Sequence, residues 1–437
     1  MNHKDTLISK LDTRQAITAV IGLGYVGLPL AIEFAETGFS VIGVDISEKK
    51  VDLINQGISY IPDIPTERLK PLVESGKIRA TTHYSELSTV DTINICVPTP
   101  LTKTKDPDMS FIINSIDEIV KICHEGMLII LESTTYPGTT REIILPRIEA
   151  TGLVAGESVF IAFSPERIDP GNKTYTVHNT PKVVGGVTPH CSEVAHKLYT
   201  SAIEQVVTVS SPTTAEMVKL LENTFRAVNI GLVNEVAMMC DKLQIDASED
   251  IEAAATKPFG FMPFFPGPGL GGHCIPVDPH YLSWKLKTLN YNARFIELAS
   301  EINTAMPLYV LDKISNALND DGKPVKNSKI VVLGVAYKRD VDDVRESPAL
   351  DIIELLRQKG GDVCYNDPHV PSIRLIDDKT MQNSEYSDAL LKQADCVVIV
   401  TDHTSYDWQH ILDTSRLVVD TRHVTAPFTG TARVVSL

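Results

Sequence analysis

The part of the sequence that most constrains the fold is residues 17–45, where two apolar stretches flank a glycine-rich turn. Ile17–Ile21 predicts a buried strand, and Gly22-Leu-Gly-Tyr-Val-Gly27 follows it directly. Residues 28–36 have a helical pattern, and the apolar stretch 41–44 ends at Asp45. Strand, glycines, helix, strand and acid stand in the order of a dinucleotide-binding unit. The alternative is a glycine-rich turn in an unrelated α/β protein.

The same turn predicts a cofactor. The glycines would let a pyrophosphate sit on the helix N-terminus, and Asp45 would accept hydrogen bonds from the adenosine ribose. A carboxylate there repels a 2′-phosphate, so the sequence favours NAD over NADP, although Lys50 adds a positive charge nearby. The predicted cofactor-binding residues of this region are Gly22, Gly24, Tyr25, Val26, Gly27, Asp45 and Lys50.

Further strands of the same sheet are predicted at 92–97, 127–131 and 159–163. An open parallel sheet binds its ligand at the carboxyl ends of its strands. Thr99 and Thr134, which follow the first two strands, are therefore cofactor contacts or simple turn formers. The loop 164–171 brings Glu166 and Arg167 to the same edge, unless it is a solvated charged loop.

A long helix is predicted after residue 212. Thr213-x-x-Glu216 is a capping box, and large apolar residues at three- and four-residue steps predict one buried stripe. Lys219, Asn223 and Arg226 share another face, which faces either a ligand or solvent. A long central helix also suits a dimer interface. The apolar stripe consists of Val218, Leu221, Phe225, Val228, Leu232, Val236 and Met239.

The loop from Gly267 to Pro279 combines four glycines with a single cysteine, Cys274. Glycine allows close approach of a ligand to the backbone, and proline fixes the loop around it. A thiol in such a loop can meet a substrate, so Cys274 is a candidate covalent nucleophile acting as the thiolate. The alternative is a tight turn whose cysteine is a small buried residue.

A second α/β unit is predicted towards the C-terminus. Its first strand is not followed by Gly-x-Gly-x-x-Gly; the loop reads Val335-Ala-Tyr-Lys-Arg-Asp340, and Arg345-Glu-Ser-Pro348 comes next. This pattern indicates a site that binds phosphate with the side chains of Lys338 and Arg345, whereas the first unit binds it with backbone groups. The predicted elements are strands at 329–334, 362–365 and 396–400 and a helix at 348–359.

Length and composition limit the remaining choices. The 437 residues suggest about three domains, and an excess of 16 acidic residues argues against nucleic acid or an anionic membrane as a partner. The N-terminus does not resemble a signal peptide, and no apolar run is long enough to span a bilayer. Seven scattered cysteines without a Cys-x-x-Cys pair predict reduced thiols, a cytoplasmic protein and no metal site.

Taken together, these motifs resemble the nucleotide-sugar 6-dehydrogenase family, which includes UDP-glucose and UDP-N-acetylhexosamine dehydrogenases. The resemblance covers nearly the whole chain through four motifs: 22–27, 216–223, 269–274 and 336–347. It implies an α/β fold with two Rossmann-like doubly wound parallel-sheet domains joined by a central helical domain. The implied parts are an NAD domain at 1–204, a helical catalytic and dimerisation domain at 205–315 and a UDP-sugar-binding domain at 316–437.

The resemblance also implies the chemistry: oxidation of the sugar's 6-hydroxyl to a carboxylate with two NAD and one water, supplying precursors of surface polysaccharides. Cys274 matches the nucleophile, and Lys219 with Asn223 matches the oxyanion-stabilising pair. Asp278 matches the aspartate that handles protons and water, with Thr134 and Glu166 nearby. The implied substrate contacts are Glu166, Arg167, Ile168, Lys219, Asn223, Arg226, Gly271, Tyr337 and Lys338, and Arg345 would contact the cofactor.

Three positions favour an N-acetylated sugar. Arg167, Pro170 and Val277 replace an aromatic residue, an acid and a lysine that are typical of the UDP-glucose branch. Arg167 could donate to the acetamido carbonyl, and the phenylalanine-rich segment 259–265 could pack on its methyl. The segment 257–265 also lacks the histidine or arginine that other branches place there. The sequence resembles UDP-N-acetylglucosamine 6-dehydrogenases most; UDP-N-acetylmannosamine, UDP-N-acetylgalactosamine and UDP-glucose are the alternative substrates.

Two other classes compete with this interpretation. A two-electron β-hydroxyacid dehydrogenase would need neither Cys274 nor the C-terminal unit. A nucleotide-sensing or structural protein would not need the set Lys219, Asn223, Cys274 and Asp278.

Overall fold

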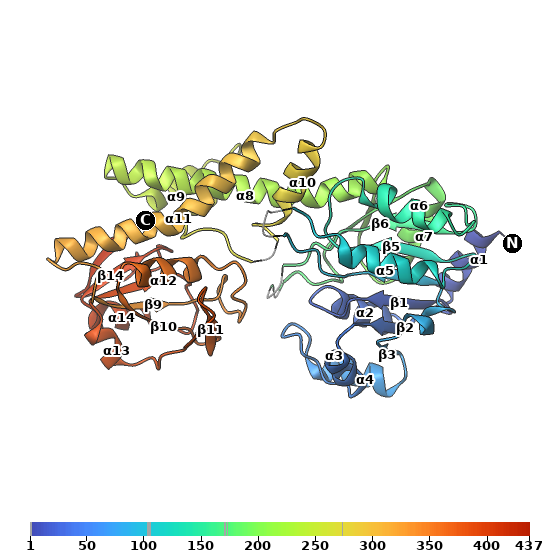
Figure 1. The fold of residues 1–437 in the computed structure, drawn as a ribbon, viewed down its shortest axis with the longest axis horizontal. Helices are drawn as coiled ribbons and strands as arrows, with labels where there is room; N and C mark the ends of the chain where they lie inside the picture. Colours follow the sequence, from blue (N-terminus) through green and yellow to red (C-terminus); the bar gives the residue numbers. More distant parts are fainter. Residues whose placement is uncertain (1, 103–105, 170–171, 173, 273) are drawn as a thin grey trace. The chain divides into compact units, whose positions relative to one another are not determined.

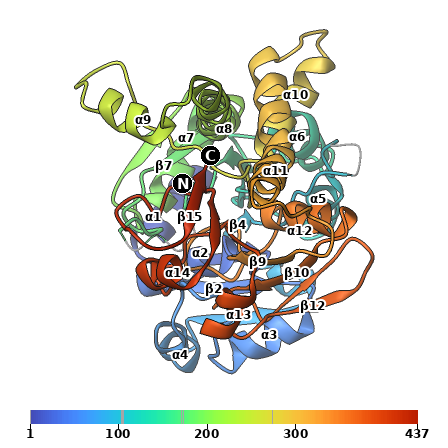
Figure 2. The same cartoon turned by 90° about the vertical axis from the view of Figure 1, so that its left-hand side faces the viewer.

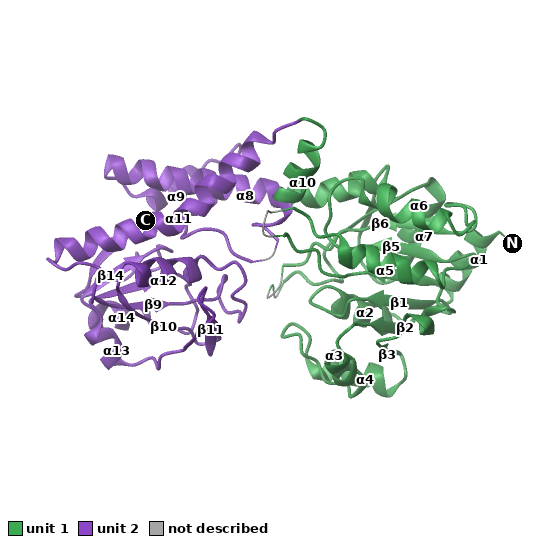
Figure 3. Ribbon diagram, in the orientation of Figure 1, with its two compact units in different colours: residues 1–222, 280–290 green, residues 223–279, 291–437 purple. Residues whose placement is uncertain are grey.

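The computed structural model describes residues 2–102, 106–169, 172, 174–272 and 274–437. The chain forms two compact units, residues 1–222 with 280–290 and residues 223–279 with 291–437 (Figure 3). The boundary at 222 and 223 falls inside the longest helix, α8 (Pro212–Leu243). The predicted three-domain division at residues 204 and 315 therefore stays a prediction.

Unit 1 is built on an eight-stranded sheet with the order β3-β2-β1-β4-β5-β6-β7-β8 (Figure 1). All neighbouring pairs are parallel except β6 and β7. Its first six strands have the order of a dinucleotide-binding fold. The strands are β1 (Ile17–Ile21), β2 (Ser40–Val44), β3 (Ile78–Thr81), β4 (Thr92–Ile95), β5 (Leu128–Leu131), β6 (Phe160–Phe163), β7 (Lys182–Gly186) and β8 (Val206–Thr208).

Helices cover both faces of this sheet. Val20 of β1 packs into the core that α1, α2 and α7 share, whereas its neighbours Ala19 and Ile21 pack into the core of α5 and α6. Because successive strand residues point to opposite faces, a strand covered on both sides reads as a continuous apolar run. The helices are α1 (His3–Asp12), α2 (Gly27–Glu36), α3 (Glu48–Asn55), α4 (Thr66–Glu74), η1 (Tyr84–Leu87), α5 (Ser110–Val120), η2 (Thr140–Ile144), α6 (Leu145–Glu149) and α7 (Pro189–Tyr199); α10 (Asp278–Lys287) begins in unit 2 and ends in unit 1.

Unit 2 contains a five-stranded parallel sheet with the order β10-β9-β13-β14-β15. Figure 2 labels β9, β10 and β15 of this sheet. One core joins α11 and α12 to one face, and a second joins α13 and α14 to the other. The strands are β9 (Lys329–Leu333), β10 (Asp362–Asn366), β13 (Cys396–Ile399), β14 (Leu417–Asp420) and β15 (Arg433–Ser436), with a hairpin of β11 (Ser372–Arg374) and β12 (Thr380–Gln382). The helices are α9 (Ala247–Ala255), α11 (Arg294–Asp320), α12 (Pro348–Gln358), α13 (Asp388–Gln393) and α14 (Trp408–Thr414). The predicted class, with two parallel sheets and a helical middle, is confirmed.

Two predictions about α8 are wrong. Ser211, not Thr213, caps the helix, because its Oγ accepts the Thr214 N–H. The expected apolar stripe is not buried: Leu221, Phe225, Leu232 and Met239 are each about half exposed.

Small and polar residues make up most of the buried face of α8 instead, together with Leu220 and Val233. A methyl group on Gly231 would lie 3.1 Å from the Cα of Ala299 in α11, so the two backbones are close. Asn234 donates from Nδ2 to Asn303 Oδ1 at 2.8 Å, and its own Oδ1 accepts the Gly267 N–H at 2.9 Å. Close contact through small residues leaves the large apolar side chains on the outside. In the part of the chain that is described, no helix is both long and apolar enough to cross a bilayer.

Candidate active site

The first glycine turn fits a pyrophosphate. Gly22 has φ of +88°, and a methyl group on it would lie 2.5 Å from the Cys96 carbonyl oxygen. A methyl group on Gly27 would lie 1.9 Å from the Gly22 carbonyl oxygen. A methyl group on Gly24, in contrast, would meet nothing within 4 Å. Gly22 and Gly27 are therefore required by the backbone, whereas Gly24 leaves room beside the N-terminus of α2.

Asp45 stands where a ribose would be bound, at the end of β2. Its side chain is 7% exposed and accepts the backbone N–H groups of Leu23 and Ser47, both at 3.0 Å. Lys50 Nζ lies 3.2 Å from Asp45 Oδ2, so this lysine pairs with the acid. Tyr25 in the glycine turn and Ile46, the residue after Asp45, are both exposed. The turn and the acid together fit NAD.

Polar residues follow the ends of β4 and β5, as predicted. The Thr99 carbonyl accepts the buried Tyr281 hydroxyl at 2.7 Å, which joins the end of β4 to α10 within unit 1. Ser133 Oγ donates to the Val97 carbonyl at 2.8 Å, and Thr134 beside it is partly exposed. Cofactor contacts by Thr99 and Thr134 stay a prediction.

A buried charge network surrounds Glu166, and sequence reasoning missed most of it. Lys182 Nζ lies 2.5 Å from Glu132 Oε2 and 3.0 Å from Glu166 Oε2, with its side chain only 4% exposed. Tyr199 donates its hydroxyl to Glu132 at 2.7 Å. The available signal was Glu132 itself, because a carboxylate at the end of a buried strand requires a partner.

Glu166 is held as a carboxylate by these contacts. Its Oε1 accepts the N–H groups of Arg167 and Ile168, at 2.6 and 2.9 Å. Burial alone would raise the pKa of Glu166, but the Lys182 ammonium and these N–H groups hold it below its ordinary value. Glu166 is therefore built to accept hydrogen bonds.

Arg167 and Arg226 differ in what they contact. Arg167 makes a forked ion pair with Glu222 in unit 1, 2.6 Å from Nη2 to Oε1, and Nη1 donates to the Pro181 carbonyl at 2.7 Å. Arg226 is exposed on α8, unlike Lys219 and Asn223, which are buried on a common face. Arg226 therefore does not lie on the buried face that Lys219 and Asn223 share, and a ligand site at these residues stays a prediction.

Glu216, taken from the sequence as part of the capping box, has another role. Its carboxylate accepts the N–H groups of Gly138 and Thr140 and the Thr140 hydroxyl, at 2.5 to 2.8 Å. Burial raises the pKa of Glu216 to about 7, and these donors oppose the rise. The side chain ties the start of α8 to η2 instead of capping its own helix.

The cysteine loop and α8 meet within unit 2. Asn223 donates from Nδ2 to the Asp278 carboxylate, and both side chains are buried. The Asp278 and Val277 N–H groups donate to the Cys274 carbonyl at 2.8 and 3.1 Å, which places the cysteine one turn before the aspartate. The Cys274 side chain is partly exposed. The structure thus brings together three of the six predicted catalytic residues.

The glycines of this loop pack on the C-terminal half of unit 2. A methyl group on Gly271 would lie 2.6 Å from Tyr337 Cβ, and one on Gly272 would lie 2.9 Å from the Tyr337 ring. The Gly272 N–H donates to the Arg345 carbonyl at 3.0 Å, while the Arg345 guanidinium pairs with Asp343 at 2.6 Å. Residues 170 and 273, which the sequence motifs include, lie outside the described residues.

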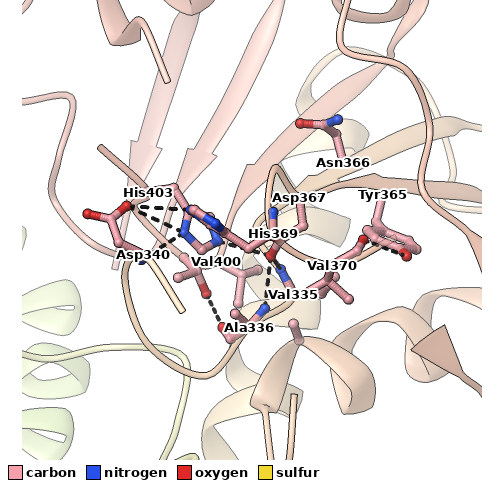
Figure 4. A network of polar contacts seen from close by, with 12 residues as sticks. Val335, Ala336, Asp340, Tyr365, Asn366, Asp367, His369, Val370, Val400 and His403 are labelled. Atoms are coloured by element: carbon pink, nitrogen blue, oxygen red, sulfur yellow. Dashed lines mark hydrogen bonds and ion pairs between the residues drawn. The ribbon is translucent and has the colours of Figure 1, made fainter. Parts of the chain in front are cut away.

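A polar network holds the loop that carries Tyr337 and Lys338 (Figure 4). Asp367 Oδ2 accepts the N–H groups of Val335 and Ala336, at 2.7 and 3.0 Å, and it lies 2.9 Å from His403 Nε2. His403 Nδ1 lies 3.0 Å from the Asp340 nitrogen and accepts its N–H. The acid and the imidazole are both fully buried.

Known proteins resemble the chain over nearly its full length. Models of the UDP-glucose/GDP-mannose dehydrogenase family match its NAD binding domain at residues 16–203, its central domain at 213–305 and its UDP binding domain at 331–427. A UDP-N-acetyl-D-mannosamine dehydrogenase of Pyrococcus horikoshii is 36% identical, over 93% of this chain and 95% of the relative. A UDP-N-acetyl-D-glucosamine 6-dehydrogenase of Pseudomonas aeruginosa is also 36% identical, over 80% and 82%. A solved structure of a UDP-D-ManNAc dehydrogenase from Pyrococcus horikoshii superposes with a TM-score of 0.87 at 34% identity, covering 96% of this chain and 98% of that one.

Proposed function

Because the chain belongs to the UDP-glucose/GDP-mannose dehydrogenase family, we propose that it oxidises the 6-hydroxyl of UDP-N-acetylglucosamine to a carboxylate. It is an NAD-dependent UDP-sugar dehydrogenase, and its relatives act on N-acetylhexosamines. The observation that carries the proposal is the cysteine loop, in which a partly exposed thiol stands one turn before the buried Asn223–Asp278 pair. A two-electron hydroxyacid dehydrogenase needs no such thiol.

NAD, when bound, accepts one hydride, so the two oxidations would use two NAD molecules in turn. Cys274 would add to the aldehyde formed by the first oxidation and hold the sugar carbon as a thiohemiacetal. The second oxidation would convert this to a thioester, which water cleaves to release the carboxylate and the thiol. Lys219, buried one turn before Asn223, would stabilise the negative oxygen that develops at this carbon. Asp278, oriented by Asn223, would position the water and accept its proton.

Glu166 would take part as a hydrogen-bond acceptor. The backbone groups of Arg167 and Ile168 fix one of its oxygens and Lys182 contacts the other, so the carboxylate cannot swing freely. Such a group would hold a water or a sugar hydroxyl in a defined position. Lys338 and Tyr337 would contact the UDP-sugar, and Arg345 the cofactor.

The acetamido group is the basis for choosing the sugar. Arg167 is fixed by Glu222 and the Pro181 carbonyl, yet a guanidinium has five N–H groups and can still donate to an acetamido carbonyl. The mannosamine and glucosamine relatives are equally identical to this chain, so overall identity does not choose between the epimers. The local sequence 164–172 supports the glucosamine epimer.

A kinetic panel tests the assignment. We expect kcat/KM to be highest for UDP-N-acetylglucosamine, lower for its mannosamine and galactosamine epimers, and lowest for UDP-glucose. The conservative variant Arg167→Lys should lower the ratio of kcat/KM for UDP-N-acetylglucosamine to kcat/KM for UDP-glucose. The reason is that lysine cannot reproduce the forked pairing with Glu222. A higher kcat/KM for UDP-glucose than for every UDP-N-acetylhexosamine would overturn the assignment.

A homodimer is part of the proposal. Leu221, Phe225, Leu232 and Met239 leave an apolar stripe along α8, and Phe264 extends it by packing edge-on against Phe225. A second copy of α8 would bury the stripe on both chains at once, as a two-fold interface requires. Leu232→Asp should give a monomer in light scattering, whereas Ile376→Asp, an exposed apolar residue outside α8, should not change the mass.

A further inference from the structure

One buried histidine holds both ends of the loop that carries Tyr337 and Lys338. At the start of the loop, Asp367 accepts the Val335 and Ala336 N–H groups and contacts His403 Nε2. At the end of the loop, the Asp340 N–H donates to the other ring nitrogen, Nδ1 (Figure 4). Asp340 has a φ of +58°, which is uncommon for a residue other than glycine.

These contacts determine the form of the imidazole. Nδ1 accepts an N–H, so it carries no proton, and Nε2 must then carry the proton that it donates to Asp367. Two other contacts support the same loop: Thr401 Oγ1 donates to the Ala336 carbonyl at 2.6 Å, and Thr404 donates to the Asp340 carboxylate twice at 2.9 Å. All of these groups belong to unit 2.

The position of the loop matters for its neighbours. The Tyr337 ring lies against Gly271 and Gly272, where there is no room for a side chain. The Tyr337 N–H donates to the Asp343 carbonyl at 2.9 Å. A shift of residues 335–340 would therefore move Lys338 and also Tyr337, against which the cysteine loop packs.

A metal site is the competing interpretation of this cluster. Among the described residues, Asp340, His369 and His403 form the one group of possible ligands whose atoms lie within 4.8 Å of one another. The Nδ1 lone pair of His403 already accepts the Asp340 N–H, however, and a metal ion would have to displace that bond. The geometry therefore favours a hydrogen-bonding role.

We propose that His403 is a positioning residue for substrate binding: it holds the 335–340 loop so that Tyr337 and Lys338 can receive the UDP part of the sugar nucleotide. The proposal rests on the proposed function, which assigns UDP to this unit. His403 itself need not contact the substrate, since it acts through the loop.

Two conservative variants separate the two bonds of His403. Asparagine places an acceptor where Nδ1 lies but no donor where Nε2 lies, and glutamine does the reverse. The end of the loop depends on the Nδ1 contact, whereas Asp367 keeps three backbone donors without histidine. We therefore expect His403→Gln to raise the dissociation constant for UDP about tenfold, and His403→Asn to raise it less than about threefold.

Calorimetry with UDP and with NAD, on the full chain, tests this expectation. The NAD dissociation constant should not change in either variant, and a melting curve should show that both variants are folded at the temperature of the titration. If His403 had only a structural role, both variants would lower the melting temperature, and the asparagine and glutamine variants would have the same dissociation constant for UDP. Equal UDP affinity in the two variants would overturn the proposal.

Lys338→Ala separates failure of this proposal from failure of the proposed function. If Lys338→Ala weakens UDP binding and His403→Gln does not, the histidine has no positioning role. If Lys338→Ala leaves UDP binding unchanged, the assignment of UDP to this loop is wrong and the proposal falls with it. UDP binding that is lost in EDTA and restored by Zn²⁺ would assign a metal site instead.

Discussion

The two parallel sheets of this protein share a nucleotide-binding scaffold but complete it in different ways. Gly22 after β1 and Gly334 after β9 both have a positive φ, +88° and +81°. A methyl group on either would lie 2.5 or 2.4 Å from a carbonyl oxygen that follows the neighbouring strand, that of Cys96 or Thr401. In both sheets an acid that follows the second strand, Asp45 or Asp367, then accepts the N–H of the residue after the glycine.

The difference lies in what else these acids contact. Asp45 is covered by the Lys50 ammonium, a side chain that is 38% exposed and can move aside. Each acid also accepts the N–H of the residue two positions later, Ser47 or His369. Asp367, however, is covered by the fully buried His403 and accepts a further backbone N–H, that of Ala336, at 3.0 Å. Under the proposed function, Asp45 would exchange its lysine for a ribose of NAD, whereas Asp367 is held by contacts within unit 2. One scaffold would then bind the dinucleotide through glycines and an acid, and the other would present side chains such as Tyr337 and Lys338 to the UDP-sugar.

Cys274→Ser should give the largest effect and should leave both nucleotide sites intact. A serine hydroxyl ionises far less readily than a thiol, so net turnover should fall on the order of a thousandfold or more. The dissociation constants of NAD and of the UDP-sugar should stay within about twofold, as measured by calorimetry. Wild-type NADH production by this variant would exclude the covalent mechanism.

Asp367→Ala should destabilise the protein much more than Asp45→Ala does. It removes the acceptor of three backbone N–H groups and of His403, and leaving each buried donor unpaired costs about 1–3 kcal/mol. We expect a loss of at least about 3 kcal/mol in the free energy of unfolding, measured with urea. Equal losses for the two variants would contradict the assignment of different roles to the two acids.

Asp45→Ala should act on the cofactor. Loss of the ribose acceptor should make the free energy of NAD binding less favourable by about 1–3 kcal/mol. The preference for NAD over NADP should also become smaller, because the repulsion of a 2′-phosphate disappears. The dissociation constants of both cofactors measure this effect, with UDP affinity as the internal control. Unchanged affinity for both cofactors would make Asp45 a residue that only ends a strand.

Lys50→Met should give the smallest effect. A half-exposed ion pair contributes about 0–1 kcal/mol, so stability should change little. NAD should bind about as tightly as before or slightly more tightly, whereas NADP should bind more weakly because a positive charge is lost. If NAD binding depended on Lys50 as strongly as on Asp45, the lysine would be a direct ligand of NAD and not only the ion-pair partner of Asp45.

The sequence predicted what depends on neighbours along the chain. The strand, glycine turn and acid of residues 17–45 are local. Partners that are distant in sequence were not predictable: Lys182 meets Glu132 across 50 residues, and His403 meets Asp340 across 63. No sequence period marks such pairs.

The α8 helix shows a second limit. Its three- and four-residue spacing identified a large apolar face, but spacing does not say which face another helix of the same chain will cover. The contact between Gly231 and Ala299 lets small residues take the inside, so the large apolar residues remain outside.

We propose a four-electron oxidation in which one cysteine, Cys274, keeps the intermediate bound between the two hydride transfers. The most direct measurement is the amount of NADH formed per UDP-N-acetylglucosamine consumed, followed to completion with purified enzyme and excess NAD. We expect two NADH per sugar, with the uronic acid as the product. One NADH per sugar with release of an aldehyde would contradict it.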